Sequence, residues 1–108
     1  MKLPQPIKVG SVIFPFVWAE KIEIDGRKMI GACTLYPAKI EIDPSLQSHP
    51  VQLVDTVMHE LTHAISFNFG LAKEKYTQEE IAILIGSGLT TVFLDNPHFI
   101  KWIKDALH

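Results

Sequence analysis

The hydrophobic and polar positions of this 108-residue chain follow two different periods, one in each half. The first fifty residues are rich in β-branched and aromatic side chains, gathered in extended runs at 7–24 and 28–42. The second run ends with Ile40 and Ile42 alternating with charged residues, as in a strand with one buried face. This half therefore predicts strands that form a small sheet.

Turn residues divide this strand-rich half. Asp25, Gly26 and Arg27 stand between the two runs and favour a tight hairpin. Pro15 and Pro37 lie inside the runs, and proline cannot donate a hydrogen bond to a β-ladder. We therefore expect each proline to mark an edge, a bulge or a break in the sheet.

From residue 51 onward the apolar positions change to a helical period. From Val51 to about Phe69 they recur at steps of three and four, and Gly70 is expected to end the helix. The apolar positions are Val54, Val57, Met58, Leu61 and Ile65. Polar residues occupy the other side of the same helix. The pattern predicts an amphipathic helix with one face in the core.

Two further helices are expected after this one. Thr77 and Glu80 have the spacing of a capping box, so a second helix should begin near Thr77 and run through the apolar segment that follows. A short terminal helix should begin at Pro97, with an inner face made of Phe99, Trp102, Ile103 and Leu107. Strands first and helices afterwards indicate a single α+β domain over residues 1–108, with strands in 1–50 and helices in 51–108.

Composition narrows the classes of partner. The net charge is −2 and no cluster of basic residues extends beyond Arg27 and Lys28, which argues against nucleic acid or an anionic membrane as partner. No run approaches membrane-spanning length and the N-terminus lacks a signal-peptide pattern, so we expect a cytoplasmic protein. The single cysteine, Cys33, cannot form an internal disulfide and is expected to be a small buried hydrophobe.

The segment Val57–Ile65, VMHELTHAI, carries the candidate chemistry. His59 and His63 are four residues apart, so both imidazoles leave one helical face and can reach the same metal ion. Glu60 lies about 100° further round the axis, where it can hold and deprotonate a water without being a ligand. This HExxH arrangement is typical of zinc hydrolases, and we expect one Zn²⁺ ion.

A catalytic zinc site needs a third protein ligand. A metzincin would have a histidine six residues after His63, but Phe69 occupies that position. A glutamate from the following helix is the other common solution, which leaves Glu79 and Glu80. We favour Glu80, although both acids also suit the first turn of a helix because of its dipole.

HELTH followed by EEIAILIGSGL, with strands before and helices after, resembles the minigluzincins, a group of small zinc peptidase-like domains also encoded by phages. The resemblance implies a zincin-like fold, a twisted sheet over the active-site helix, and His59, His63 and a glutamate as zinc ligands. It also implies that the strand at Ala38–Ile42 can pair with an extended peptide substrate.

Two functions of different classes follow from these residues. In the first, the protein is a zinc metallopeptidase that hydrolyses peptide bonds, with Glu60 as general base and with activity that is narrow or latent in so small a chain. In the second, it is a catalytically idle, zinc-stabilised binding module. Glu60 favours the first, because a purely structural site needs no glutamate beside its first ligand. The sequence leaves the substrate and the oligomeric state open.

Overall fold

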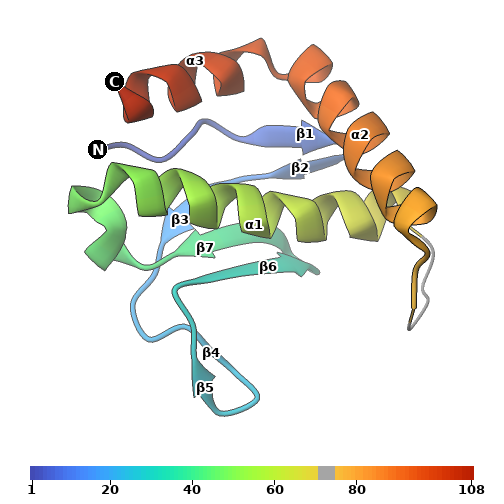
Figure 1. Ribbon diagram of the computed structural model, residues 1–108. Helices are drawn as coiled ribbons and strands as arrows, with labels where there is room; N and C mark the ends of the chain where they lie inside the picture. Colours follow the sequence, from blue (N-terminus) through green and yellow to red (C-terminus); the bar gives the residue numbers. More distant parts are fainter. Residues whose placement is uncertain (71–74) are drawn as a thin grey trace.

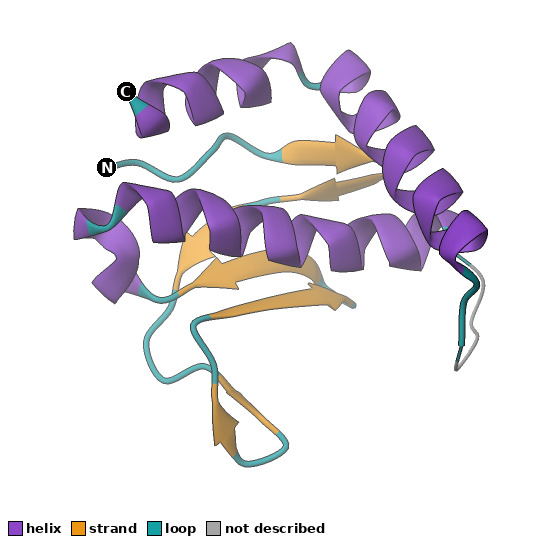
Figure 2. Cartoon of the chain, in the orientation of Figure 1, coloured by secondary structure: helices purple, strands orange, loops and turns teal. Residues whose placement is uncertain are grey.

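The computed structural model describes residues 1–70 and 75–108 (Figure 1). The strands are β1 (Ile7–Val9), β2 (Val12–Phe14), β3 (Phe16–Trp18), β4 (Glu23–Ile24), β5 (Arg27–Lys28), β6 (Gly31–Leu35) and β7 (Ala38–Ile42). The helices are the 3₁₀-helix η1 (Pro44–Ser48) and the α-helices α1 (Pro50–Phe69), α2 (Gln78–Asp95) and α3 (Pro97–Leu107). Strands precede helices, as the change of period predicts, and the α+β class is confirmed (Figure 2).

The strands of the described residues form three small sheets rather than one. β1 and β2 make an antiparallel hairpin, β4 and β5 make another, and β3, β7 and β6 form a sheet in that order. Pro15 separates β2 from β3, and Pro37 lies in the turn between β6 and β7. Both prolines therefore mark breaks, as expected from their missing N–H group.

β7 is the central strand of its sheet. It pairs in parallel with β3, with Phe16 opposite Ile40, and antiparallel with β6, with Cys33 opposite the same Ile40. Ile40 and Ile42 are fully buried, which confirms the alternation read from the sequence. The prediction that the strand Ala38–Ile42 offers a free edge to a peptide is wrong, because both of its edges are already hydrogen-bonded to neighbouring strands.

The turn between β4 and β5 is the tight hairpin that the sequence indicates. Asp25 and Gly26 both have positive φ angles, 52° and 75°. A two-residue turn with positive φ at both positions matches the twist of the flanking strands, and an aspartate followed by glycine adopts it readily. This hairpin projects away from the helices (Figure 1).

Helix α1 runs across the sheet and supplies much of the core. It starts at Pro50 and ends at Phe69, with Gly70 as the C-cap residue, close to the predicted bounds. Its buried side chains meet those of the strands in one hydrophobic cluster, to which α1 contributes Leu53, Val57, Leu61, Ala64 and Ile65. The amphipathic pattern thus decides which side of α1 faces the sheet.

Helices α2 and α3 begin as their capping residues predict. The Thr77 side chain accepts from the Glu80 N–H, and the Glu80 side chain accepts from the Thr77 N–H, which completes a capping box. α3 has Pro97 in its first turn and buries Phe99. Leu107, expected on the inner face of α3, is exposed, and Ala106 is buried instead. Because Ala106 and Leu107 are about 100° apart around the helix axis, the last turn of α3 is rotated from the predicted inner face.

A buried asparagine ties the helices to the N-terminal hairpin. Asn96, at the junction of α2 and α3, accepts from the Lys8 N–H at 2.8 Å and donates to the Lys8 carbonyl at 2.7 Å. Its amide thereby pairs with β1 as a neighbouring strand would. The Trp102 indole also donates to the Lys2 carbonyl at 2.9 Å, and the two termini lie side by side in Figure 1.

The described residues include no helix with both the length and the apolar character needed to cross a membrane.

Replacing Asn96 should destabilise the protein through this contact. Asn96→Ala leaves the backbone N–H and C=O of Lys8 without partners, and we expect the free energy of unfolding to fall by about 2 kcal/mol or more. Urea denaturation followed by circular dichroism measures the loss. Thr34→Ala, which removes an exposed hydroxyl bonded to the Pro37 carbonyl, should cost less than about 1 kcal/mol. Equal losses in the two variants would contradict the role of Asn96.

Candidate functional site

Helix α1 places His59 and His63 side by side. Their ring centroids are 5.1 Å apart in an edge-to-face arrangement, as expected for residues one turn apart on a regular helix. Both side chains reach solvent, and that of His59 is 66% exposed. The imidazole nitrogens are therefore accessible to a ligand from outside the fold.

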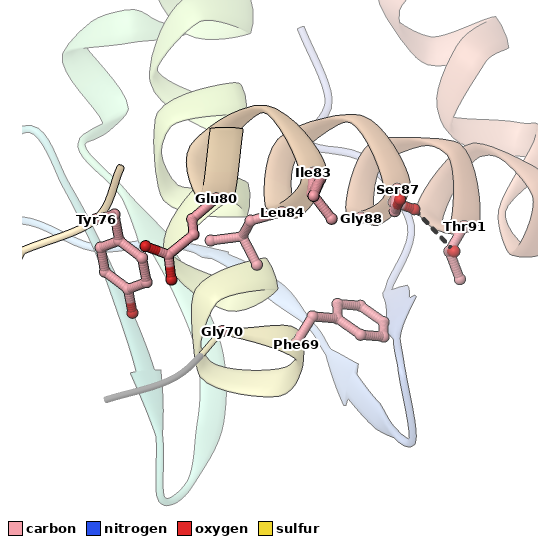
Figure 3. A pocket seen from close by; sticks show the side chains of 9 residues that line it. All are labelled: Phe69, Gly70, Tyr76, Glu80, Ile83, Leu84, Ser87, Gly88 and Thr91. Atoms are coloured by element: carbon pink, nitrogen blue, oxygen red, sulfur yellow. Dashed lines mark hydrogen bonds between the residues drawn. The ribbon is translucent and has the colours of Figure 1, made fainter. Parts of the chain in front are cut away.

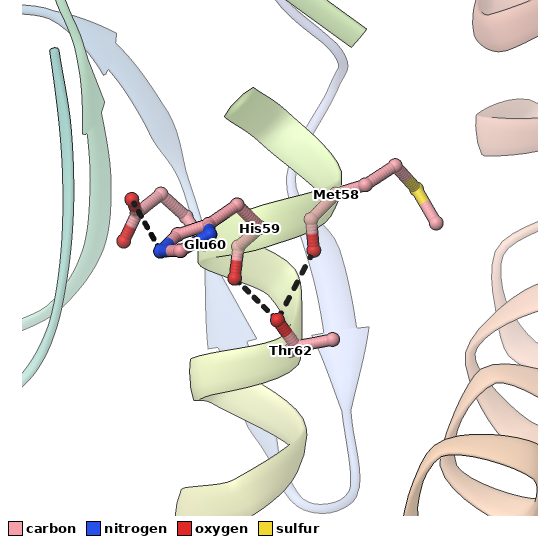
Figure 4. A network of polar contacts seen from close by, with 4 residues as sticks. All are labelled: Met58, His59, Glu60 and Thr62. Carbon is pink, nitrogen blue, oxygen red and sulfur yellow. Dashed lines mark hydrogen bonds and ion pairs between the residues drawn. The ribbon is translucent and has the colours of Figure 1, made fainter. Parts of the chain in front are cut away.

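The turn that carries the two histidines has an additional side-chain contact. The Thr62 hydroxyl donates to the carbonyl oxygens of His59 and Met58 (Figure 4). The Thr62 hydroxyl is therefore hydrogen-bonded to carbonyl groups of its own helix and needs no partner from another element. Met58 points away from His59 and Glu60 in the same view, toward the side of α1 that packs on the core.

Glu60 lies beside the histidines but is buried. Its side chain is 7% exposed, and its Oε2 atom is 4.0 Å from the Nε2 atom of His59. Burial raises the pKa of the Glu60 carboxyl, while the nearby His59 and His63 act in the opposite direction. The result is a carboxyl group with an increased proton affinity directly next to two exposed imidazoles.

Strand β6 lies against Glu60 at a glycine. A Cβ atom added to Gly31 would lie 2.9 Å from Cγ2 of Thr56 and 3.0 Å from Oε2 of Glu60. Real Cβ atoms almost never approach other atoms this closely, so any larger residue would force α1 and β6 apart. Gly31 therefore allows the carboxylate of Glu60 to pack directly against the backbone of β6.

A small pocket opens at this contact. It has a volume of about 140 Å³ and is lined by Ile30, Gly31, Asp55, Thr56, His59 and Glu60. Its walls come from Ile30, from Gly31 at the start of β6 and from two successive turns of α1. Asp55, one turn before His59, shares this pocket and is exposed to solvent.

Cys33 lies further along β6. It packs against the hydrophobic cluster, and burial together with the charge of Glu60 raises the pKa of its thiol to about 12. A thiol with this pKa stays protonated at neutral pH and is a poor nucleophile and metal ligand. The expectation that Cys33 acts as a small hydrophobe agrees with its packing, although the residue is only partly buried.

The outer edge of β6 was not indicated by the sequence. The Asp43 N–H donates to the Ile30 carbonyl, and this register makes Ile30, Ala32 and Thr34 the residues whose backbone groups face β7. The backbone N–H and C=O groups of Gly31, Cys33 and Leu35 therefore point to the other side. Among the described residues no strand pairs there, so β6 is an open edge that starts beside Glu60.

Glu80, the residue favoured as third ligand, lies in the capping box of α2. Glu79 occupies the preceding position in the same first turn and is exposed. Within residues 1–70 and 75–108, no three His, Cys, Asp or Glu side chains lie close enough to hold one metal ion. The structure thus brings together His59, Glu60 and His63 but not Glu80, whose assignment as a ligand stays a prediction.

A second, larger cavity of about 320 Å³ lies between α2 and the end of α1 (Figure 3). Its lining residues are Phe69, Gly70, Tyr76, Glu80, Ile83, Leu84, Ser87, Gly88 and Thr91. Glu80 and Tyr76 stand at one end and Thr91 at the other, with Phe69 facing α2 across the cavity. The sequence did not point to this cavity, because it depends on how two helices cross.

Comparison of the chain with protein-family models, with curated proteins and with solved structures gives no match.

The close contact at Gly31 can be tested by adding one methyl group. Gly31→Ala should lower the free energy of unfolding by about 1–3 kcal/mol, because the methyl group overlaps Thr56 and Glu60. Adding Thr56→Ser removes the nearest of the contacting atoms and should restore part of the loss. Urea denaturation of the single and double variants measures both effects. A Gly31→Ala variant as stable as the wild type would show that α1 does not pack this closely on β6.

The buried carboxyl of Glu60 should make stability depend on pH. A group whose pKa is raised by folding contributes stability below its ordinary value of 4.5, and this contribution is lost as the pH rises through the folded-state pKa. Glu60→Gln removes this dependence. In metal-free protein we expect the wild type to lose stability relative to Glu60→Gln as the pH rises from about 4 to about 7. Urea denaturation across this range measures the difference, and a difference that stays constant would contradict the raised pKa.

Proposed function

We propose that this protein is a zinc-dependent metallopeptidase whose general base is Glu60. The observation that carries the proposal is the geometry on α1: two exposed imidazoles with ring centroids 5.1 Å apart, beside a buried carboxyl group 4.0 Å from one of them. A structural role alone does not account for a buried glutamate at this position, because leaving a carboxylate in an apolar contact costs free energy.

The two ligand candidates that α1 provides are of a type that binds zinc. His59 and His63 would hold the ion through their ring nitrogens, and the ion supplies the Lewis acidity that activates a water molecule and polarises a carbonyl group. Glu80 or Glu79 would complete the set after a movement of the first turn of α2. In metal-free protein the Glu80 side chain caps its own helix instead.

Glu60 has the position and the environment of a proton acceptor. It takes a proton from the attacking water and donates it to the amine that leaves. Its pKa, raised by burial, is better matched to proton transfer near neutral pH than that of an exposed glutamate. The backbone of β6 at Gly31 holds the carboxyl group against the sheet and restricts its movement.

The open edge of β6 is the proposed binding place for the peptide. The outward N–H and C=O groups of Gly31, Cys33 and Leu35 can pair with an extended chain, which adds a strand to the sheet. Because Gly31 is in contact with Glu60, a peptide paired at that residue passes next to the carboxyl group and the two histidines. This edge replaces Ala38–Ile42 as the substrate strand.

The resemblance of HELTH and EEIAILIGSGL to the minigluzincins supports the same reading. In that group a glutamate of the helix after the motif is the third ligand. If zinc does not draw Glu80 or Glu79 out of the first turn of α2, the enzyme stays latent.

Metal content and peptide cleavage, measured on the same samples, test the proposal. We expect one zinc per chain in the wild type and cleavage within a broad peptide library. His63→Ala should lose the metal and the activity. Glu60→Gln should retain the metal while kcat falls by about 10²–10⁴-fold. His49→Ala removes an exposed histidine outside the site and is the matched control, with no expected change.

The third ligand is decided by Glu80→Ala and Glu79→Ala, of which one should lose zinc and the other should not. A wild-type protein that binds no zinc would overturn the enzyme proposal. Zinc binding without cleavage in any library would support the alternative, a zinc-stabilised binding module.

A further inference from the structure

Helix α2 contains an unusually long uncharged segment for a helix at the surface. Residues 81–94 include no Asp, Glu, Lys, Arg or His, and most of them are apolar. Only Gly88 and Val92 of the whole helix are buried. A helix that is apolar on all sides normally has its other faces covered as well.

The outward face of α2 forms a continuous stripe. Ile83, Gly86, Thr90 and Leu94 follow one another at steps of three and four residues, so they lie along one side of the helix. Ile83 is 58% exposed and Leu94 is 78% exposed. This stripe, together with the neighbouring Ala82, is called the α2 outer face below.

The polar group within the α2 outer face is already satisfied. The Thr90 hydroxyl donates to the carbonyl oxygen of Gly86 within the same helix, at 2.8 Å. Its hydrogen-bonding capacity as a donor is thus used inside α2, and its methyl group adds to the apolar surface. A partner could cover this face without leaving the hydroxyl donor unpaired.

Gly86 at the middle of this face has no packing neighbour that explains it within residues 1–70 and 75–108. It is the ninth of the eighteen residues of α2, and a Cβ atom added there would meet none of the described atoms within 4 Å. A glycine inside a helix costs about 0.5–1 kcal/mol relative to alanine. Packing on α1 explains the glycine at position 88, by contrast, because a Cβ atom on Gly88 would lie 2.4 Å from Cγ2 of Ile65. An open glycine at a helix midpoint allows the backbone of another helix to approach closely.

We propose that the α2 outer face is the interface of a symmetric homodimer, in which α2 of one copy crosses α2 of a second copy at Gly86. A two-fold axis through the midpoint brings Gly86 against the Gly86 of the other copy and gives the longest overlap of the two helices. In such a dimer the same patch of each copy forms the interface, and an uncharged patch can pack against itself without bringing like charges together.

Large apolar side chains remain exposed along most of α2. Ile81, Ile83, Ile85 and Leu94 are 42%, 58%, 37% and 78% exposed, and a large exposed apolar patch on a folded protein usually marks an interaction site. Phe69, which is 44% exposed, lines the same cavity as Ile83, so the apolar surface continues onto the end of α1.

Charge at the helix ends favours an antiparallel crossing. Glu79 and Glu80 lie in the first turn of α2. A parallel pair would set these acids beside the same acids of the second copy, which is repulsive. An antiparallel pair separates them by about the length of the helix, roughly 27 Å for eighteen residues. It places them near Asp95, the last residue of α2 in the other copy, so that neither end of the pair collects four acids.

Sedimentation equilibrium over a range of concentrations tests the dimer. At about 100 μM we expect a mass twice the 12.2 kDa of one chain, falling to the monomer mass on dilution. If association were non-specific, Gly86→Leu would strengthen it, because the substitution adds apolar surface. In the proposed close crossing the added side chain separates the two helices, so the dissociation constant of the dimer should rise at least tenfold. A monomer at every concentration, a mass above that of a dimer, or a Gly86→Leu variant that associates equally or more strongly would overturn the proposal.

A matched pair of charge substitutions separates this face from other exposed apolar positions. Ile83→Glu places a charge in the α2 outer face and should abolish the dimer. Val51→Glu makes the same kind of change at a 70% exposed position in the first turn of α1 and should leave association unchanged. Circular dichroism and thermal unfolding of dilute samples check that both variants are folded. Equal effects of the two substitutions would overturn the proposal.

Oxidative cross-linking tests the orientation. Gly86→Cys should link two copies, because the two midpoints meet at the crossing. Leu94→Cys should not, because in an antiparallel pair the two positions lie roughly 24 Å apart, eight residues on either side of the midpoint. Efficient linking through Leu94→Cys without linking through Gly86→Cys would contradict the proposed crossing.

Discussion

The close contact between α1 and β6 at Gly31 is the constraint on which the candidate site depends. With no side chain at Gly31, the helix approaches the strand until Thr56 and Glu60 meet its backbone. The same approach fixes the rotation of α1, so the neighbouring His59 is turned outward while Glu60 is turned inward. One glycine thus separates two adjacent polar residues into an exposed metal ligand candidate and a buried base candidate.

The rest of the fold holds this contact in place through long-range pairings. β7 joins β3 and β6 into one sheet under α1, and the fully buried Ile40 and Ile42 connect that sheet to the hydrophobic cluster. Asn96 then attaches the later helices to the N-terminal hairpin through both backbone groups of Lys8. Helix α2 packs on α1, where Gly88 lies against Ile65, and also on β1.

Helix α2 differs from α1 in how its apolar residues are used. α1 buries most of its apolar side chains, whereas α2 leaves Ile83 and Leu94 in solvent and contributes one wall of a cavity. Two roles therefore meet on α2: its first turn carries the candidate third ligands, and its outward face suits a second copy. The candidate ligands lie in the first turn of the helix, and the α2 outer face is centred on its midpoint.

The features that the sequence alone determined are local ones. The turn at Asp25 and Gly26, the capping box at Thr77, the bounds of α1 and the proximity of His59 to His63 could all be predicted, because each depends on residues within a few positions of one another. Only the tertiary structure decided that β7 is a central strand, that β6 is the open edge and that Glu60 is buried against Gly31. It also decided that Glu80 caps its own helix. These outcomes depend on which distant segments pair and how two helices cross, and hydrophobic periodicity carries no information about either.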